Sequence, residues 1–362
     1  MSSFADRLRQ ALVSDVKAPM VWMTATFALV GLIVAALVAT AVGLEDVALP
    51  AGFVAALAGV AGGLVPPSLT RQVAVPAAIA VALAPVLALL GEGRPVVAGV
   101  VSAVVFTVGT LAQQDVPTGR LVGAIGSTAY VLAVGMALVR DVPLSHSFWA
   151  GVIGLATAAV TTFASRAVRG WQQRHGRAAA MPEIPPLPGR FASRLVSGIR
   201  TALRDWRHNE YVWLALRRVV VLTPLVAILE AWRDPVALYA FVVAFSITQP
   251  TALDTLNRAL ARTAGTLGAI VVTIVVALIT PDWLLAGFAV LAMVSGLAYL
   301  LRSPFLTAVG TTVLTVTAGF LAGTSTNATD RLLSTVAGAL VGLLATGLIP
   351  MPGSPEEPVP EQ

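Results

Sequence analysis

Long runs of apolar residues, separated by short polar segments, occupy most of the chain. Crossing the ~30 Å hydrocarbon core of a bilayer takes about 20 helical residues, and twelve runs approach or reach that length. They extend approximately over Met20–Val42, Leu49–Val65, Val73–Leu90, Val96–Leu111, Leu121–Val139, Phe148–Ala164, Val212–Trp232, Val236–Gln249, Leu260–Thr280, Trp283–Leu301, Phe305–Gly323 and Leu332–Ile349. None shows the period of two that is typical of membrane β-strands. The pattern predicts an all-α, polytopic membrane protein with twelve transmembrane helices.

Composition supports this prediction and excludes several functions. Of 362 residues, 57% are hydrophobic and 11% are charged, whereas a soluble domain has about 25% charged residues. The chain has no Cys and three widely separated His, so we expect neither a metal site nor a cofactor. It contains no phosphate-binding loop, no hydrolase or metalloprotease motif and no paired catalytic carboxylates, so we expect that it is not an enzyme.

Lysine and arginine are distributed unevenly between alternate loops. With the N-terminus placed in the cytoplasm, nineteen of them fall on the inner side and four on the outer side. Cytoplasmic loops of membrane proteins carry this excess of positive charge. We therefore expect both termini in the cytoplasm.

Short sequence matches recur in order at a nearly constant offset of 184–191 residues. They pair Phe4–Leu8 with Phe191–Leu195, Val21–Met23 with Val212–Leu214, Val47–Leu49 with Val236–Leu238, Ala98–Gly99 with Ala286–Gly287, Ala124–Thr128 with Ala308–Thr312, and Gly154 with Gly338. Each copy holds six spans, an even number, so both copies begin on the same side of the membrane. The matches predict two parallel six-helix repeats related by an axis along the membrane normal.

The repeats define the expected domains. These are a first membrane repeat over 1–167, a basic, Pro-rich cytoplasmic linker over 168–190, a second membrane repeat over 191–350 and a disordered tail over 351–362. Each repeat opens with an amphipathic stretch, beginning at Phe4 and at Phe191, in which apolar residues recur every four residues. Such helices lie on the membrane surface and contact anionic lipid headgroups, whereas nucleic-acid binding is not expected.

The second span of each repeat is short and is closed by proline, at Pro66 and at Pro250. Interrupted helices at matching places in two halves point to a transport site, because the helix that restarts presents free N–H groups and the positive end of its dipole. Ser68 and Thr251 are the expected N-caps. Asp254 completes a capping-box pattern with Thr251, so an alternative stays open in which this acid occupies the helix start.

Polar residues are densest around Pro250. Arg258 and Arg262 lie four residues apart on one helical face, where two guanidinium groups suit a carboxylate. Hydroxyl residues in both repeats add a polar path between them, although such hydroxyls also bond to their own helix. The expected substrate-binding residues are Ser127, Thr128, Ser246, Gln249, Thr251, Arg258, Arg262, Thr311 and Thr312. For the arginines, the alternative is contact with lipid headgroups together with a salt bridge to Asp254.

Two acids near span ends are the candidates for ion coupling. Glu230 lies near the outer end of the seventh span and Asp254 near the inner end of the eighth. An interfacial ion pair between Glu230 and Arg233 is the alternative.

The run Tyr239–Pro250, followed by Asn257-Arg258, Arg262 and Gly265–Ala269, resembles the signature of the fusaric acid resistance / aromatic acid exporter family. The stretch Arg331–Gly338 is similar to its last helix. The resemblance implies a multi-pass protein of the bacterial inner membrane. It also implies efflux of aromatic carboxylic acids or related amphiphilic anions, driven by protons. Larger members insert a cytoplasmic domain between the halves, where this chain has a short linker.

Two other functions stay open from the sequence: a passive anion channel of the same fold, and a membrane scaffold that transports nothing. The expected partners are a small organic anion and the lipid bilayer, and assembly into a homo-oligomer stays open.

Overall fold

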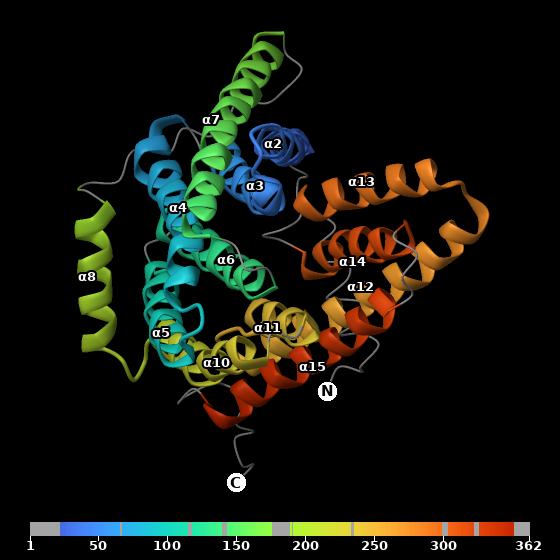
Figure 1. The fold of residues 1–362 in the computed structure, drawn as a ribbon. Coiled ribbons are helices and arrows are strands. Elements are labelled where there is room, and N and C mark those ends of the chain that lie inside the picture. The colour runs from blue at the N-terminus through green and yellow to red at the C-terminus, as the bar shows by residue number, and fades with distance from the viewer. Residues whose placement is uncertain are drawn as a thin grey trace.

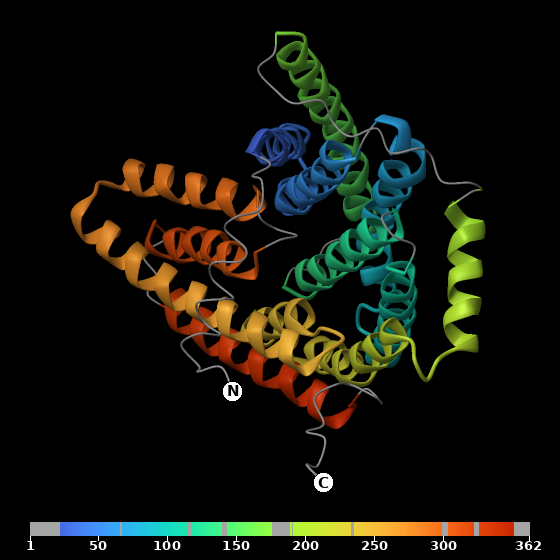
Figure 2. The same cartoon turned by 180° about the vertical axis from the view of Figure 1, so that it is seen from behind.

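The computed structural model describes residues 22–65, 67–114, 118–139, 143–175, 189, 191–232, 235–298, 303–321 and 326–350. The predicted amphipathic stretch at Phe4, most of the linker and the predicted disordered tail lie outside these ranges. Within them the chain is helical and contains no strand, which confirms the all-α prediction (Figures 1 and 2).

The helices are α2 (Trp22–Ala41), α3 (Ala48–Leu64), α4 (Val75–Leu90), α5 (Pro95–Ala112), α6 (Thr118–Val139), α7 (Leu144–Arg174), α8 (Phe191–Arg204), α9 (Glu210–Arg217), α10 (Thr223–Trp232), α11 (Pro235–Ile247), α12 (Ala252–Ile279), α13 (Asp282–Ala298), α14 (Pro304–Leu321) and α15 (Thr326–Leu348). Short 3₁₀ or π turns are η1 (Glu45–Val47), η2 (Pro67–Leu69), η3 (Thr70–Ala74) and η4 (Arg218–Leu222).

Each apolar run singled out in the sequence falls on a helix, and α9, η4 and α10 join into one continuous run. Seven helical runs in the described part of the chain are long and apolar enough to cross a membrane by length and composition. The second helix of each half is shorter than the 18 residues required of these runs, with 17 residues in α3 and 13 in α11. Many large apolar side chains are exposed, among them Val271, Val275 and Leu278 of α12. Exposed apolar surface of this extent fits a lipid environment.

Several helix pairs recur in the two halves, although α2 packs closely on α3 and α7 whereas α10, the first helix of the second half, contacts α11 only slightly. In the first half α3 packs on α7, and α6 packs on both α4 and α5; in the second half α11 packs on α15, and α14 packs on both α12 and α13. Counted from the start of each half, the second helix contacts the sixth, and the fifth contacts the third and fourth. Contacts between the halves are also reciprocal, because α2 packs on α13 and α10 packs on α5.

A glycine allows the second and sixth helices of each half to approach closely. A Cβ atom added to Gly154 of α7 would lie 2.6 Å from the Cβ of Val54 on α3. One added to Gly338 of α15 would lie 2.7 Å from the Cβ of Val243 on α11. Because small residues let helix backbones approach in lipid, these two glycines set the same contact in both halves.

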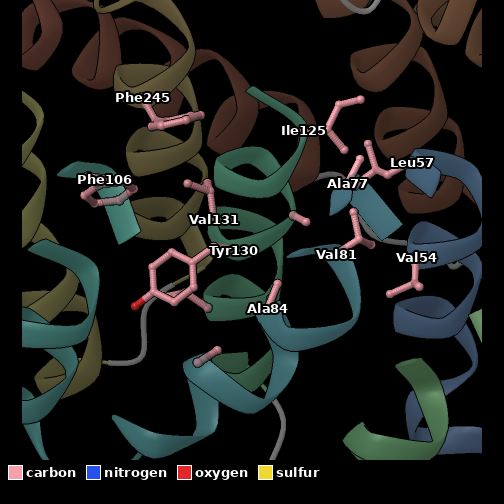
Figure 3. Close-up of a cluster of buried hydrophobic side chains, with 14 of the residues drawn as sticks. Val54, Leu57, Ala77, Val81, Ala84, Phe106, Ile125, Tyr130, Val131 and Phe245 are labelled. Atoms are coloured by element: carbon pink, nitrogen blue, oxygen red, sulfur yellow. The ribbon is translucent and has the colours of Figure 1, made fainter. Parts of the chain in front are cut away.

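The main apolar core joins the halves. Figure 3 shows Phe106 of α5 and Tyr130 of α6 close to Phe245 of α11, with the aliphatic residues of α3, α4 and α6 beside them. The Phe106 ring connects the two halves at this junction. It contacts the Tyr130 ring edge-on at 6.0 Å and stacks on the Phe245 ring at 5.6 Å between centroids.

The predicted amphipathic helix at Phe191 is present as α8 and stands at the edge of the bundle (Figure 1). Its Ala202 is buried, and with Ile199 it packs against residues of α5 and α9. Arg200 and Arg204 are exposed. One face of α8 is therefore fixed to the bundle while its arginines are accessible.

We expect Gly338→Val to lower the stability of the detergent-solubilised protein by about 1–3 kcal/mol, because the added methyl groups overlap Val243. Gly347→Val is the matched control on the same helix, since a Cβ there meets nothing within 4 Å. Thermal unfolding followed by circular dichroism measures both. Equal melting temperatures for the two variants would contradict the close contact.

Candidate functional site

Both predicted helix breaks are present. In the second half, α11 ends at Ile247 and α12 begins at Ala252, with Pro250 in the non-helical connection. The Thr251 hydroxyl accepts a hydrogen bond from the Asp254 backbone N–H at 3.0 Å, which confirms Thr251 as the N-cap. In the first half α3 ends at Leu64, and Val65 is extended (φ −93°, ψ 129°), the conformation that a following proline imposes.

The prediction of Ser68 as an N-cap is wrong. Ser68 lies inside the 3₁₀ turn η2, and the N-cap position of the following turn belongs to Leu69, whose side chain makes no cap. The chain restarts here through a 3₁₀ turn and a π turn rather than directly as an α-helix, and this shifts the serine out of the capping position.

A buried arginine holds the break of the second half together. Arg217 of α9 is 2% exposed. Its Nη1 donates to the carbonyl oxygens of Gln249, at 2.9 Å, and Pro250, and its Nε donates to that of Ile349 at 2.8 Å. These are carbonyls that interruption of α11 and the end of α15 leave without a helical partner. The guanidinium therefore satisfies backbone groups that otherwise require water.

An arginine does the same in the first half. Arg166 of α7 donates from Nη2 to the carbonyls of Gly62 (2.9 Å) and Val65 (3.2 Å), and from Nη1 to the Thr70 hydroxyl (2.9 Å). The sequence prediction missed both Arg166 and Arg217, because it used the arginines of the loops only to orient the chain in the membrane.

The polar residues next to Pro250 are engaged locally. Ser246 donates to the Val243 carbonyl at 2.7 Å, and the Gln249 side chain donates to the Thr248 carbonyl at 2.8 Å. The Gln249 backbone N–H donates to the Thr255 hydroxyl at 3.0 Å. As substrate-binding candidates these residues remain predictions, and here they shape the break.

Arg262 lies in the interior of the second half. It is 9% exposed and belongs to the buried stripe of α12 that also contains Ala259 and Thr266. It has no hydrogen-bond partner among the described residues. Another cation, Arg331 of α15, lies near enough to act on it electrostatically. The sequence predicted only that Arg262 shares a helical face with Arg258, and the structure places Arg262 within the helix packing.

Arg331 is the second member of this pair, and the sequence prediction placed it only on the outer side. Its guanidinium carbon lies 4.0 Å from the centre of the Tyr239 ring of α11. Its Nε donates to the Thr315 hydroxyl of α14 at 2.8 Å, and its Nη2 to the Thr311 carbonyl at 3.5 Å. Arg331 is thus fixed by two helices while it faces Arg262. The resemblance of the last helix to a known signature was the available signal for it.

Two hydroxyl pairs set the register of α12 against α15, which lie side by side (Figures 1 and 2). Thr346 donates to Thr255 at 3.3 Å, and Thr266 contacts Thr335 at 3.4 Å. The pairs are eleven residues apart on each helix, which is about 16 Å along the axis. Arg262 lies between them, so polar groups flank it along the interface of α12 and α15.

The remaining hydroxyl candidates are not gathered at the arginines. Thr128 donates to the Ala124 carbonyl at 2.8 Å and Thr311 to the Thr307 carbonyl at 2.9 Å, which confirms the alternative that such hydroxyls bond to their own helix. Ser127 is buried against the backbone of α5 at Gly109, and its hydroxyl has no partner. Thr312 is buried. The carbonyl of Thr311 alone among these residues contacts an arginine.

The two coupling candidates differ in environment. Glu230 is 8% exposed and accepts a hydrogen bond from the backbone N–H of Gly93 in the turn between α4 and α5. Asp254 is exposed at the start of α12. Glu230 thus ties the second half to the first, and Arg233, its predicted partner, lies outside the described residues.

A shallow groove along α15 is lined by Leu340, Leu343, Leu344, Gly347 and Leu348. It offers an anion no polar side chain. The arginine pair is therefore the better candidate site.

Comparison with known families gives one match: residues 220–345 match the family described as fusaric acid resistance protein-like. This range contains Tyr239, Arg262 and Arg331. No curated protein and no solved structure matched the chain.

We expect Arg217→Gln to destabilise the protein strongly, because it removes hydrogen bonds from a charged donor that are worth roughly 1.5–3 kcal/mol each. Arg204→Gln, on the exposed face of α8, is the control with the same change of charge. Thermal unfolding in detergent compares them. A melting temperature of Arg217→Gln equal to that of the control would show that water replaces the guanidinium at the break.

Proposed function

We propose that the chain is a membrane transport protein of the fusaric acid resistance protein-like family, whose model matches residues 220–345, and that it exports organic anions. The observation that carries the proposal is the pair formed by Arg262 and Arg331. Arg262 of α12 and Arg331 of α15 lie near enough to repel each other, and Arg262 has no hydrogen-bond partner in the described part of the chain.

An anionic ligand accounts for this pair physically. Charged side chains at membrane depth are costly and mark ion or substrate pathways, and an unpaired buried charge is destabilising. A carboxylate accepts two parallel hydrogen bonds from a guanidinium. Bound between Arg262 and Arg331, it neutralises repulsion and supplies the missing acceptor.

The surroundings support an anion with an aromatic or apolar body as the substrate. Arg331 already stacks on the Tyr239 ring, and flat aromatic faces attract guanidinium groups. About two turns along α12 from Arg262, Ala269 packs with small and apolar residues of α13 and α14, such as Ala289 and Val313. Aromatic carboxylic acids and related amphiphiles combine both features.

We further propose twelve spans in two parallel repeats, enclosing the path along their seam. The matching helix pairs of the two halves support this, as do the equivalent contacts of Gly154 and Gly338 and the two arginines that hold the breaks. In this arrangement the protein lies in the bacterial inner membrane with both termini in the cytoplasm. Proton-driven efflux is part of the proposal, and Glu230 is the buried acid available to it.

In proteoliposomes, we expect Arg262→Gln to raise the apparent KM for benzoate about ten-fold or more, equivalent to about 1.4 kcal/mol of binding free energy. Arg258→Ala combined with Arg262→Ala lowers the affinity at least as much. Arg94→Gln, an exposed residue, is the control. Uptake of labelled benzoate is measured with and without a pH gradient.

The same preparation separates the alternatives. Saturable uptake that follows the pH gradient supports a carrier, whereas voltage-dependent current in planar bilayers indicates a channel. If neither saturable uptake nor current is observed, the remaining alternative is a membrane scaffold that transports nothing. Uptake by Arg262→Gln with an unchanged KM would remove the arginine pair from the site.

The proposed sidedness is tested by single cysteines, because the chain has none of its own. We expect a membrane-impermeant maleimide to label Glu45→Cys from the outside of intact cells. Ser193→Cys of α8 is expected to react only after the membrane is opened. Labelling of Ser193→Cys in intact cells would rule out parallel repeats with a cytoplasmic α8.

A further inference from the structure

Arg218 is the first residue of the π turn η4 and lies at the seam between the two halves. Its side chain is 6% exposed. Its Nη1 donates to the Thr110 hydroxyl of α5 at 2.9 Å, and its guanidinium carbon lies 4.7 Å from the centre of the Phe245 ring of α11. Thr110 belongs to the first half and Phe245 to the second. π turns inside helices occur frequently at functional sites.

Part of this guanidinium is unsatisfied. The Nε atom of Arg218 is buried and has no hydrogen-bond partner. The neighbouring Arg217 is different, because its Nε and Nη1 both donate to backbone carbonyls. A buried donor without an acceptor is destabilising. Arg217 therefore serves the structure, while Arg218 holds a donor that a ligand can use.

A second cation lies near Arg218. Arg258 of α12 lies close enough to act on it electrostatically. Within the described ranges no carboxylate forms a salt bridge with Arg218. Like charges repel strongly where water is excluded, and a bound anion converts this repulsion into two attractions.

The wall of the seam beside Arg218 is aromatic. In Figure 3 the rings of Phe245, Phe106 and Tyr130 follow one another from α11 to α5 and α6. The Tyr130 hydroxyl is engaged with Ser102 at 2.8 Å, and Phe106 and Tyr130 are fully buried in the core, whereas the Phe245 ring lies against the Arg218 guanidinium. Such a wall suits the apolar body of an organic acid.

We propose that Arg218 and Arg258 form a second anion-binding site, which takes the carboxylate of a monocarboxylic acid whose apolar body lies against Phe245. The proposal rests on the proposed function, because both sites serve one substrate. Arg258 and Arg262 are one helical turn apart on α12, so the seam site adjoins the site of Arg262 and Arg331. An anion passes from one to the other along α12.

Equilibrium binding of radiolabelled benzoate to the full chain in nanodiscs tests the proposal. We expect two molecules bound per chain in the wild type and one in Arg218→Gln. Arg94→Gln is the control, because it removes one positive charge in the same way, and we expect it to bind two benzoate molecules per chain. Arg218→Lys keeps the charge but lacks Nε, so it binds the second molecule at least ~10-fold more weakly. This variant keeps the test valid if Arg218→Gln does not fold.

The outcomes separate this inference from the proposed function. If Arg218→Gln loses one bound benzoate molecule and Arg262→Gln loses the other, the result supports both the seam site and the proposed function. The wild type could instead bind a single benzoate molecule. If Arg218→Gln abolishes this binding and Arg262→Gln retains it, the result supports the seam site and contradicts the function assigned to Arg262. If Arg218→Gln and Arg218→Lys bind benzoate with the same stoichiometry and affinity as the wild type, the seam site is overturned. It is also overturned if the wild type binds no benzoate.

Discussion

Positive charge buried in an apolar helix bundle is the constraint on which this structure depends. Each guanidinium inside the bundle needs acceptors, and the chain supplies them unequally. Arg217 and Arg166 are satisfied by carbonyls that the helix breaks leave free. Arg262 and the Nε of Arg218 are left without acceptors in the described structure. The satisfied arginines hold the fold, and the unsatisfied ones are the places where an anion gains most from binding.

The sequence predicted the helices well because their cause is local. Apolar runs of span length, proline at the breaks and a threonine N-cap each act over a few residues, and Thr251 caps α12 as expected. Arg262 was identified because it lies four residues from Arg258. The partners Arg217, Arg166 and Arg331 were not, because they act through contacts distant in sequence. Counting charges by loop assigns such residues to the membrane surface, whereas long side chains reach buried carbonyls and rings.

The halves share several helix contacts but not their chemistry. Gly154 and Gly338 set the same helix contact, yet at the break of the first half Arg166 is engaged with backbone carbonyls and a hydroxyl, and Arg71 is exposed. The matched family range lies entirely in the second half. The first half therefore contributes mainly structure: the support for Arg218 at Thr110, and the turn at Gly93 that Glu230 holds.

The proposed anion path follows the arginine face of α12. Single cysteines placed along that face at Thr255, Ala259 and Thr266, and on the exposed face at Val271 and Val275, test it directly in a chain without other cysteines. The account predicts that a small, charged thiol reagent modifies the three positions on the arginine face and not the two exposed ones, and that benzoate slows the modification. Modification confined to Thr255 at the end of the helix, or unaffected by benzoate, would contradict it.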